Sequence, residues 1–310
     1  MQISPARYRH IAIGALVALA VIIVTGAAVR LTNSGLGCDD WPNCSSERFV
    51  DVSSKHAAIE QLNRLFTGVV GVAVIAAVLG SFVRAGERRR DLVWLSVLLV
   101  IGVLANAVLG GISVLVDLHP IAVQGHMLLS MGLIVAGAVL VRRAGEPDLV
   151  QRERVVTRPT QRLTWLLMGV TWVAVFTGTL VTGAGPHAGD EDAKRLDLAI
   201  PDVARVHGVA VLTAIAVALL IAWRIRQFAN DRQALINVWS TWIVVAGLQA
   251  AIGYIQYFND VPALLVGIHV AGATLVMLVT TNVVLDTTRP SIEIGALSAS
   301  ETSPILVGPM

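Results

Sequence analysis

The sequence predicts an all-α integral membrane protein with eight transmembrane helices, arranged as two pseudo-symmetric four-helix bundles. Of its 310 residues, 55% are hydrophobic and 14% are charged, and the mean hydropathy is +0.73; soluble domains are far less apolar. Apolar runs of about 20 residues recur, the length that crosses a bilayer core. We expect spans at 9–30, 57–83, 92–115, 121–141, 163–183, 203–223, 236–257 and 262–285.

The distribution of basic residues predicts the orientation. With the N-terminus in the cytoplasm, most of the 23 Lys and Arg residues fall in cytoplasmic segments, including clusters at 84–90 and 142–162. This asymmetry favours cytoplasmic N- and C-termini in the cell membrane. The first span is too long for a removed signal peptide and is expected to remain as an anchor. The net charge of +2 gives no reason to expect a nucleic-acid partner.

The chain contains an internal repeat. Asn63 precedes His207 by 144 residues, and His126 precedes His269 by 143. A Thr-Gly pair in the first span recurs in the fifth, and LANAVLGG in the third span matches GLQAAIGY in the seventh. Because each half has an even number of spans, the predicted symmetry axis is normal to the membrane.

This repeat divides the chain into two halves, a linker and a tail. The linker is Arg-rich and cytoplasmic, and the tail is expected to be disordered. The expected boundaries are 1–141 for the N-terminal half, 142–162 for the linker, 163–286 for the C-terminal half and 287–310 for the tail.

Asn63, His126, His207 and His269 are predicted at one depth, near the outer ends of the even spans. Each histidine follows a proline near the start of its helix by six or seven residues, which places it about 9–10 Å below the outer surface. A histidine inside a membrane helix is costly without a partner. His207 and His269 can therefore both ligate one haem iron and close its coordination sphere, as electron transfer requires. The alternative is that each hydrogen-bonds across the bundle.

The N-terminal half lacks this symmetry. It has His126, but Asn63 stands where the repeat predicts a second histidine. It also has Glu60 one turn before Asn63, where the C-terminal half has an alanine. An incompletely ligated iron beside a buried carboxylate is suited to catalysis or substrate exchange. Glu60 could instead be solvated at the helix mouth, or paired with Arg64 or Lys55.

Several other polar residues near the outer surface are weaker candidates. His56 could face the same site as Asn63 or be exposed, His119 could cover the site or cap its helix, and His187 could touch a haem edge. Three arginines at outer helix ends could hold haem propionates or extend to the membrane interface. These arginines are Arg30, Arg64 and Arg205.

The only two cysteines, Cys38 and Cys44, lie in the first outer loop. An extracytoplasmic loop is oxidising enough to keep a small disulfide ring closed. Two free thiols, or a metal site lacking further ligands, are the alternatives.

Taken together, these motifs resemble the haem A synthase family. The resemblance rests on GLGCDDWPNC with its two cysteines, IEQLNR (59–64), DLHPIAVQGH (117–126), ARVHG (204–208) and GIHV (267–270), and it covers all eight spans, roughly 10–286. The chain departs from the family pattern at Asn63, where relatives often have a partner histidine, and it lacks a second cysteine pair that some relatives carry. These departures suggest a subgroup.

The resemblance implies an oxidoreductase that converts the C8 methyl group of haem O to a formyl group, giving haem A for cytochrome c oxidase. It implies a resident haem b on His207 and His269, a substrate haem in the N-terminal half with His126 as iron ligand, and Glu60 at the catalytic acid position. Water is the implied oxygen source. The implied partners are the haem O synthase (protohaem farnesyltransferase), an electron acceptor, membrane lipid and a second copy of the chain.

A different class of function also fits the residues. A di-haem electron-transfer protein would need two haem sites but no substrate chemistry, and a haem carrier is a third possibility. Glu60 and the broken histidine symmetry argue against a pure relay, which would profit from keeping both pairs of ligands.

Overall fold

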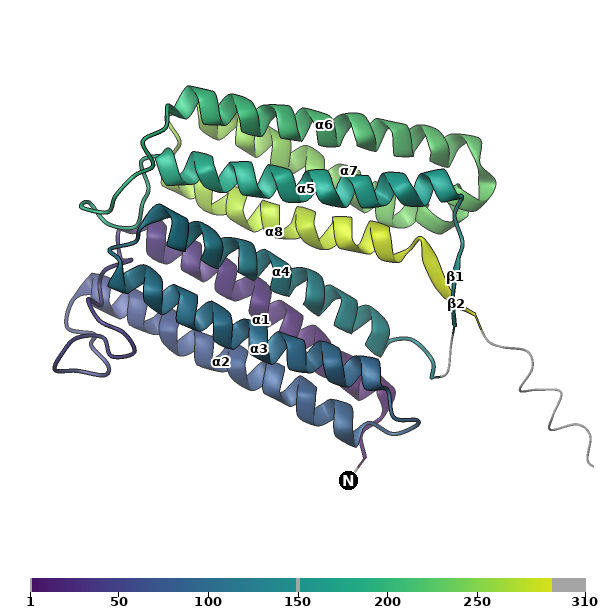
Figure 1. Ribbon diagram of the computed structural model, residues 1–310, viewed down its shortest axis with the longest axis horizontal. Coiled ribbons are helices and arrows are strands. Elements are labelled where there is room, and N and C mark those ends of the chain that lie inside the picture. The colour runs from purple at the N-terminus through teal and green to yellow at the C-terminus, as the bar shows by residue number, and fades with distance from the viewer. Residues whose placement is uncertain (1, 149–150, 292–310) are drawn as a thin grey trace, which may run out of the picture.

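The computed structural model describes residues 2–148 and 151–291, which form eight long helices and two short strands (Figure 1). All eight helices coincide with the predicted spans and are long and apolar enough to cross a membrane. The helices are α1 (Pro5–Leu31), α2 (Lys55–Val83), α3 (Arg90–Leu115), α4 (Pro120–Ala144), α5 (Arg158–Ala184), α6 (Ile200–Gln227), α7 (Ala229–Phe258) and α8 (Ala263–Leu285), and the strands are β1 (Gln151–Arg154) and β2 (Thr288–Ser291).

Local sequence signals mark several helix starts. Ser4 caps α1 by accepting a hydrogen bond from the backbone N–H of Arg7, and Ser54 caps α2 in the same way. Pro120 is the first residue of α4 and Pro201 the second of α6, where a proline loses no helical hydrogen bond.

The helices pack as two groups of four. Within α1–α4, the helices α1 and α3 each contact both α2 and α4, so α2 and α4 occupy diagonal corners. The same pattern in α5–α8 places α6 and α8 on a diagonal. The groups meet where α8 packs against α1 and α4, and where α4 packs against α5 (Figure 1).

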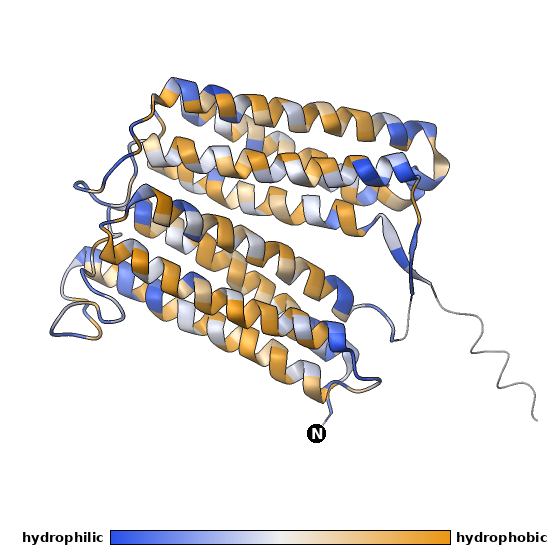
Figure 2. Ribbon diagram, in the orientation of Figure 1, coloured by the Kyte–Doolittle hydropathy of each residue, from blue (hydrophilic) through white to orange (hydrophobic). Residues whose placement is uncertain are grey.

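The two ends of the molecule differ. The loops after α1, α3, α5 and α7 gather at one end, called here the loop end, and the N-terminus, the linker and both strands lie at the other, the linker end (Figure 1). Figure 2 shows apolar residues along the helices and hydrophilic residues at both ends. Many large apolar side chains on the outer helix faces are exposed, as expected for surfaces that contact lipid acyl chains.

The repeat is visible in the turns that precede α4 and α8. Asp117 and Leu118 both have positive φ, 52° and 55°, and the equivalent Asp260 and Val261 have 57° and 54°. This left-handed conformation is uncommon outside glycine. Its occurrence twice shows that the two halves share backbone detail as well as helix order.

The linker and the first part of the tail differ from expectation. Helices α4 and α5 extend further than the sequence suggested, so the connection shortens to 145–157 and contains β1. β1 pairs antiparallel with β2. The prediction of a disordered tail is therefore wrong for 288–291, because backbone pairing with the linker orders this segment. The remainder, 292–310, lies outside the described residues.

Candidate functional site

The four predicted polar residues lie on the four even helices, Asn63 on α2, His126 on α4, His207 on α6 and His269 on α8. Each half therefore carries two of them on diagonally opposite helices. In the C-terminal half both are histidines, and in the N-terminal half one is an asparagine. Each half thus carries two of these residues on two different even helices.

In the N-terminal half, α3 orients His126. The Nδ1 atom of His126 lies 3.0 Å from the backbone oxygen of Asn106. One turn later on α3, a Cβ at Gly110 would come within 2.9 Å of the Cε1 atom of His126. The absence of a side chain at Gly110 thus lets the ring lie against the helix. With Nδ1 engaged, Nε2 is the nitrogen left to bind a metal.

The C-terminal histidines have matching surroundings. His207 places Nδ1 3.2 Å from the hydroxyl of Thr177 on α5, and a Cβ at the next residue, Gly178, would lie 3.2 Å from Cε1 of the ring. His269 packs on Gly253 of α7, where a Cβ would lie 2.8 Å from Cε1. Within the described ranges, Nδ1 of His269 is buried without a hydrogen-bond partner. Three imidazoles thus rest on glycines of the preceding helix.

Asn63 also contacts the helix that precedes its own, through a shorter side chain. Its Oδ1 accepts a hydrogen bond of 2.8 Å from the hydroxyl of Thr25 on α1. Thr25 is the repeat equivalent of Thr177, which contacts His207. The asparagine therefore keeps the contact to the neighbouring helix, and it has no ring that extends beyond this contact.

Glu60 is buried, with 5% of its surface exposed, which excludes a solvated acid at the helix mouth. Its Oε1 accepts hydrogen bonds from Nε and Nη2 of Arg64 at 3.0 and 2.6 Å, and its Oε2 accepts one of 2.8 Å from the backbone N–H of Cys38. The ion pair with Arg64, one of the alternatives from sequence, is present, and Lys55 is exposed.

These contacts attach the disulfide loop to the bundle. Cys38 and Cys44 form a disulfide, and Nη1 of Arg64 donates to the backbone oxygens of Asp40 and Asn43 inside the ring. Trp41 of the same ring packs so closely on α3 that a Cβ at Gly111 would come 2.3 Å from its indole. The ring is therefore held over the N-terminal bundle from two helices.

The remaining predicted histidines lie at the periphery. His56 is exposed, with Nδ1 2.9 Å from the hydroxyl of Ser34. His119 is the N-cap residue of α4 but makes no capping hydrogen bond through its side chain. His187 places Nε2 2.8 Å from the backbone oxygen of Val261, which joins the α5–α6 and α7–α8 loops. His187 therefore joins two loops, His56 is a surface residue in contact with Ser34, and His119 precedes α4.

The three arginines have different environments. Arg30 joins the two halves, because its Nε donates to the backbone oxygen of His187 at 2.5 Å and its Nη2 to that of Thr182 at 2.9 Å. Arg64 is engaged by Glu60 and the disulfide ring. Arg205 is 79% exposed and pairs with Asp202 on the same helix. They do not form one cluster.

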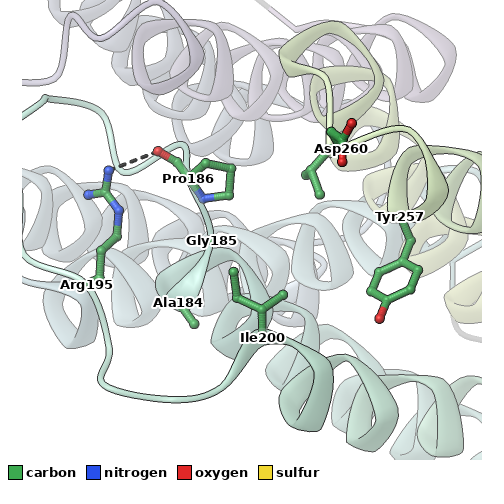
Figure 3. A pocket seen from close by; sticks show the side chains of 8 residues that line it. Ala184, Gly185, Pro186, Arg195, Ile200, Tyr257 and Asp260 are labelled. Carbon is green, nitrogen blue, oxygen red and sulfur yellow. Dashed lines mark hydrogen bonds between the residues drawn. The ribbon is translucent and has the colours of Figure 1, made fainter.

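A hollow lies at the loop end of the C-terminal half (Figure 3). Arg195 and Pro186 line one side and are joined by a hydrogen bond of 2.9 Å, and Tyr257 and Asp260 line the other. Its residue Ile200 precedes His207 by two helical turns, so the hollow lies roughly 10 Å from the level of the histidines.

Comparisons with known proteins show which family the chain belongs to. The family model of cytochrome oxidase assembly proteins (COX15-CtaA) matches residues 9–189. The chain belongs to this family. Together with the eight apolar helices, family membership makes it a multi-pass membrane protein.

Individual relatives of the chain carry the name haem A synthase. The protein of Exiguobacterium sibiricum is 28% identical over 53% of this chain, an alignment that spans only 56% of that relative. The protein of Bradyrhizobium diazoefficiens is 27% identical over 97% of this chain and 94% of its own length. The protein of Bacillus cereus is 24% identical over 92% and 94% respectively. The similarity thus includes the C-terminal half, beyond the range of the family match.

Sequence reasoning did not identify the residues that support the histidines. Thr25, Thr177, Gly110 and Gly253 emerged as matching positions of the repeat, but without a role. The available signal was that each matching position lies on the helix preceding a polar residue of the site. Their contacts with Asn63 and the imidazole rings became visible only in the packed bundle.

Proposed function

We propose that this protein is a haem A synthase that oxidises the C8 methyl group of haem O to a formyl group, with water as the oxygen source. The asymmetry between two equivalent sites is the observation that carries this proposal. One half has two histidines on diagonal helices, whereas the other has His126, Asn63 and the buried carboxylate of Glu60. A protein that only relays electrons would not need a buried carboxylate and an asparagine in one of its two halves.

The residues of the C-terminal half fit a resident haem b. His207 and His269 supply two imidazoles from opposite corners of the bundle. Nδ1 of His207 contacts the hydroxyl of Thr177, so Nε2 is the nitrogen available for iron. Two axial imidazoles suit electron transfer without ligand exchange. A bound haem b would supply an acceptor for electrons removed from the methyl group and a donor to an external electron acceptor.

The residues of the N-terminal half fit a substrate haem. His126 has its Nδ1 against a backbone oxygen, as metal-ligating histidines commonly do. Glu60 holds a negative charge in a buried position that two donors, Arg64 and the N–H of Cys38, keep fixed. This carboxylate would stabilise positive charge that develops at the methyl group, or accept a proton from it.

We place the loop end, with both haem sites near it, on the extracytoplasmic side of the cell membrane. The disulfide supports this orientation, because such bonds persist in oxidising compartments. Substrate haem O would come from the haem O synthase, and haem A would go to cytochrome c oxidase. Lipid surrounds the apolar helix faces in this proposal, and association with a second copy stays a prediction.

Pigment analysis tests the proposal. The protein is co-expressed with a haem O synthase in a host that makes no haem A, and extracted haems are separated and identified by mass. We expect haem A, accompanied by haem B from the purified protein. Haem B alone, with haem O unchanged in the membranes, would favour the di-haem electron-transfer protein instead.

A further inference from the structure

The N-terminal half has open space where the C-terminal half has an imidazole ring. Thr25 and Thr177 are equivalent, and the hydroxyl oxygen of each contacts a side chain on the even helix that follows. The partner atom is Oδ1 of Asn63 in one half and Nδ1 of His207 in the other. Oδ1 of asparagine thus takes the place of Nδ1 of histidine in the contact with threonine. Asparagine has no atom in the place of Nε2.

The glycine that follows each threonine shows whether a ring lies beside it. A Cβ at Gly178 would lie 3.2 Å from Cε1 of His207. At the equivalent Gly26, a Cβ would meet nothing within 4 Å apart from its own helix, as far as the structure describes the chain. No described side chain therefore lies beside Gly26 in the way that the ring of His207 lies beside Gly178.

Asn63 is poorly suited to fill this space by ligating iron itself. Its Oδ1 is occupied by the hydroxyl of Thr25, and an amide is a weak ligand for iron compared with imidazole. Its Nδ2 makes no hydrogen bond with any described residue. An N–H group thus remains available beside the open space.

We propose that the N-terminal half contains a binding site for one small neutral iron ligand, of the size of water or a diatomic molecule, bounded by Thr25, Gly26 and Asn63. The ligand would bind the iron that His126 holds and accept a hydrogen bond from Nδ2 of Asn63. This inference rests on the proposed substrate haem in that half. The C-terminal half has no such site, because His207 occupies the equivalent volume.

Carbon monoxide is the probe for this site, because it binds ferrous haem only where an axial position is free. The full-length protein is purified with both haems, the haem content is measured chemically, and the reduced protein is titrated with the gas while its absorption spectrum is recorded. We expect the N-terminal haem to show the spectral shift of a carbon monoxide complex and the C-terminal haem to remain unchanged. An unchanged spectrum of both haems would overturn the inference.

Three substitutions at the two equivalent positions locate the site. Asn63→His should abolish the carbon monoxide shift, because the imidazole enters the space beside Gly26. Asn63→Met should do the same if the histidine variant folds poorly, because a thioether is also a haem iron ligand. His207→Asn should open the C-terminal haem and add a second shift. Carbon monoxide binding that persists in both Asn63 variants would contradict the proposed location.

The outcomes separate this inference from the proposed function. A protein that converts haem O to haem A but binds no carbon monoxide retains the function and loses the small-ligand site. A protein whose N-terminal half takes up no haem contradicts both.

Discussion

At the scale of single residues, the two halves share one framework and differ in a few side chains. The imidazoles of His126, His207 and His269 each rest on a glycine of the preceding helix, so the backbone provides the space and the side chain determines the chemistry. Asn63 in place of a histidine therefore changes the side chain at this position within the same helical framework.

We expect His207→Ala or His269→Ala to abolish the low-spin spectrum of haem b, because loss of either imidazole opens the iron. The spectra of the purified, reduced variants provide the measurement. His10→Ala is the control, since His10 is exposed near the linker end. A bis-imidazole spectrum that survives in purified His269→Ala protein would remove His269 from the site.

We expect Glu60→Gln to lower haem A formation by roughly 100-fold or more while haem b stays bound. The amide keeps the size of the side chain and an acceptor for the N–H of Cys38, but it removes the charge. Hydroxylated intermediates or unchanged haem O, measured in extracted pigments, should accumulate.

Arg64→Gln is the matched comparison for Glu60, because it breaks the same ion pair and leaves the carboxylate in place. If both variants lose haem A formation equally, Glu60 acts by holding the loop. A greater loss in Glu60→Gln is the result expected for a carboxylate that participates in the reaction. Normal haem A formation by Glu60→Gln would show that the carboxylate takes no part in the reaction.

At the scale of elements, the loop between α1 and α2 is the part of the N-terminal half without a close counterpart in the other half. Its disulfide ring is held by Arg64 and Glu60 on α2 and by the packing of Trp41 on Gly111 of α3. The charged pair therefore serves two purposes, since it keeps the carboxylate in position and fixes the loop above it.

We expect Cys38 and Cys44 to resist alkylation until a reductant is added. Cys38→Ser or Cys44→Ser should reduce stability by about 2–3 kcal/mol, because an open ring gives the unfolded chain more freedom. Haem A formation should fall, whereas the haem b spectrum should persist because the ring covers the other half. Thiols that react freely in protein from native membranes would contradict the disulfide, and loss of haem b would contradict its local role.

At the scale of the whole molecule, the two bundles are joined at both ends. At the loop end, Arg30 on α1 donates to backbone oxygens after and within α5, and the N–H of Gly35 donates to the oxygen of Gly189. Between the helices, Gln124 of α4 donates a hydrogen bond to the hydroxyl of Thr179 on α5. At the linker end, β1 pairs with β2. These contacts hold the two bundles in one fixed relation.

We expect Arg30→Met to destabilise the protein by about 2–4 kcal/mol, because hydrogen bonds from a charged donor are lost at the junction of the halves. Thermal unfolding in detergent provides the measurement. Arg205→Met is the control, since the Arg205 side chain is 79% exposed and pairs with Asp202 on the same helix; it should leave the unfolding temperature unchanged. Equal unfolding temperatures for both variants would show that Arg30 does not stabilise the junction.

Much of the fold and of the site follows from sequence alone. Eight apolar runs determine eight spans, because each run must satisfy its backbone hydrogen bonds internally when it enters lipid. The constant rise of a helix converts positions of His126, His207 and His269 into matched depths. The repeat shows which residues are equivalent, and so identifies Asn63 and Glu60 as the departures. All of these are local properties of the chain.

Only the tertiary structure decided how these residues are partnered. Glu60 could pair with Arg64, with Lys55 or with water, and the position of the disulfide ring selects Arg64 and the N–H of Cys38. The contact of Thr25 with Asn63 depends on how α1 packs against α2. The order of residues 288–291 depends on a strand more than a hundred residues earlier. Hydropathy and helical periodicity describe a segment by itself, whereas these contacts depend on the packing of segments that are distant in sequence.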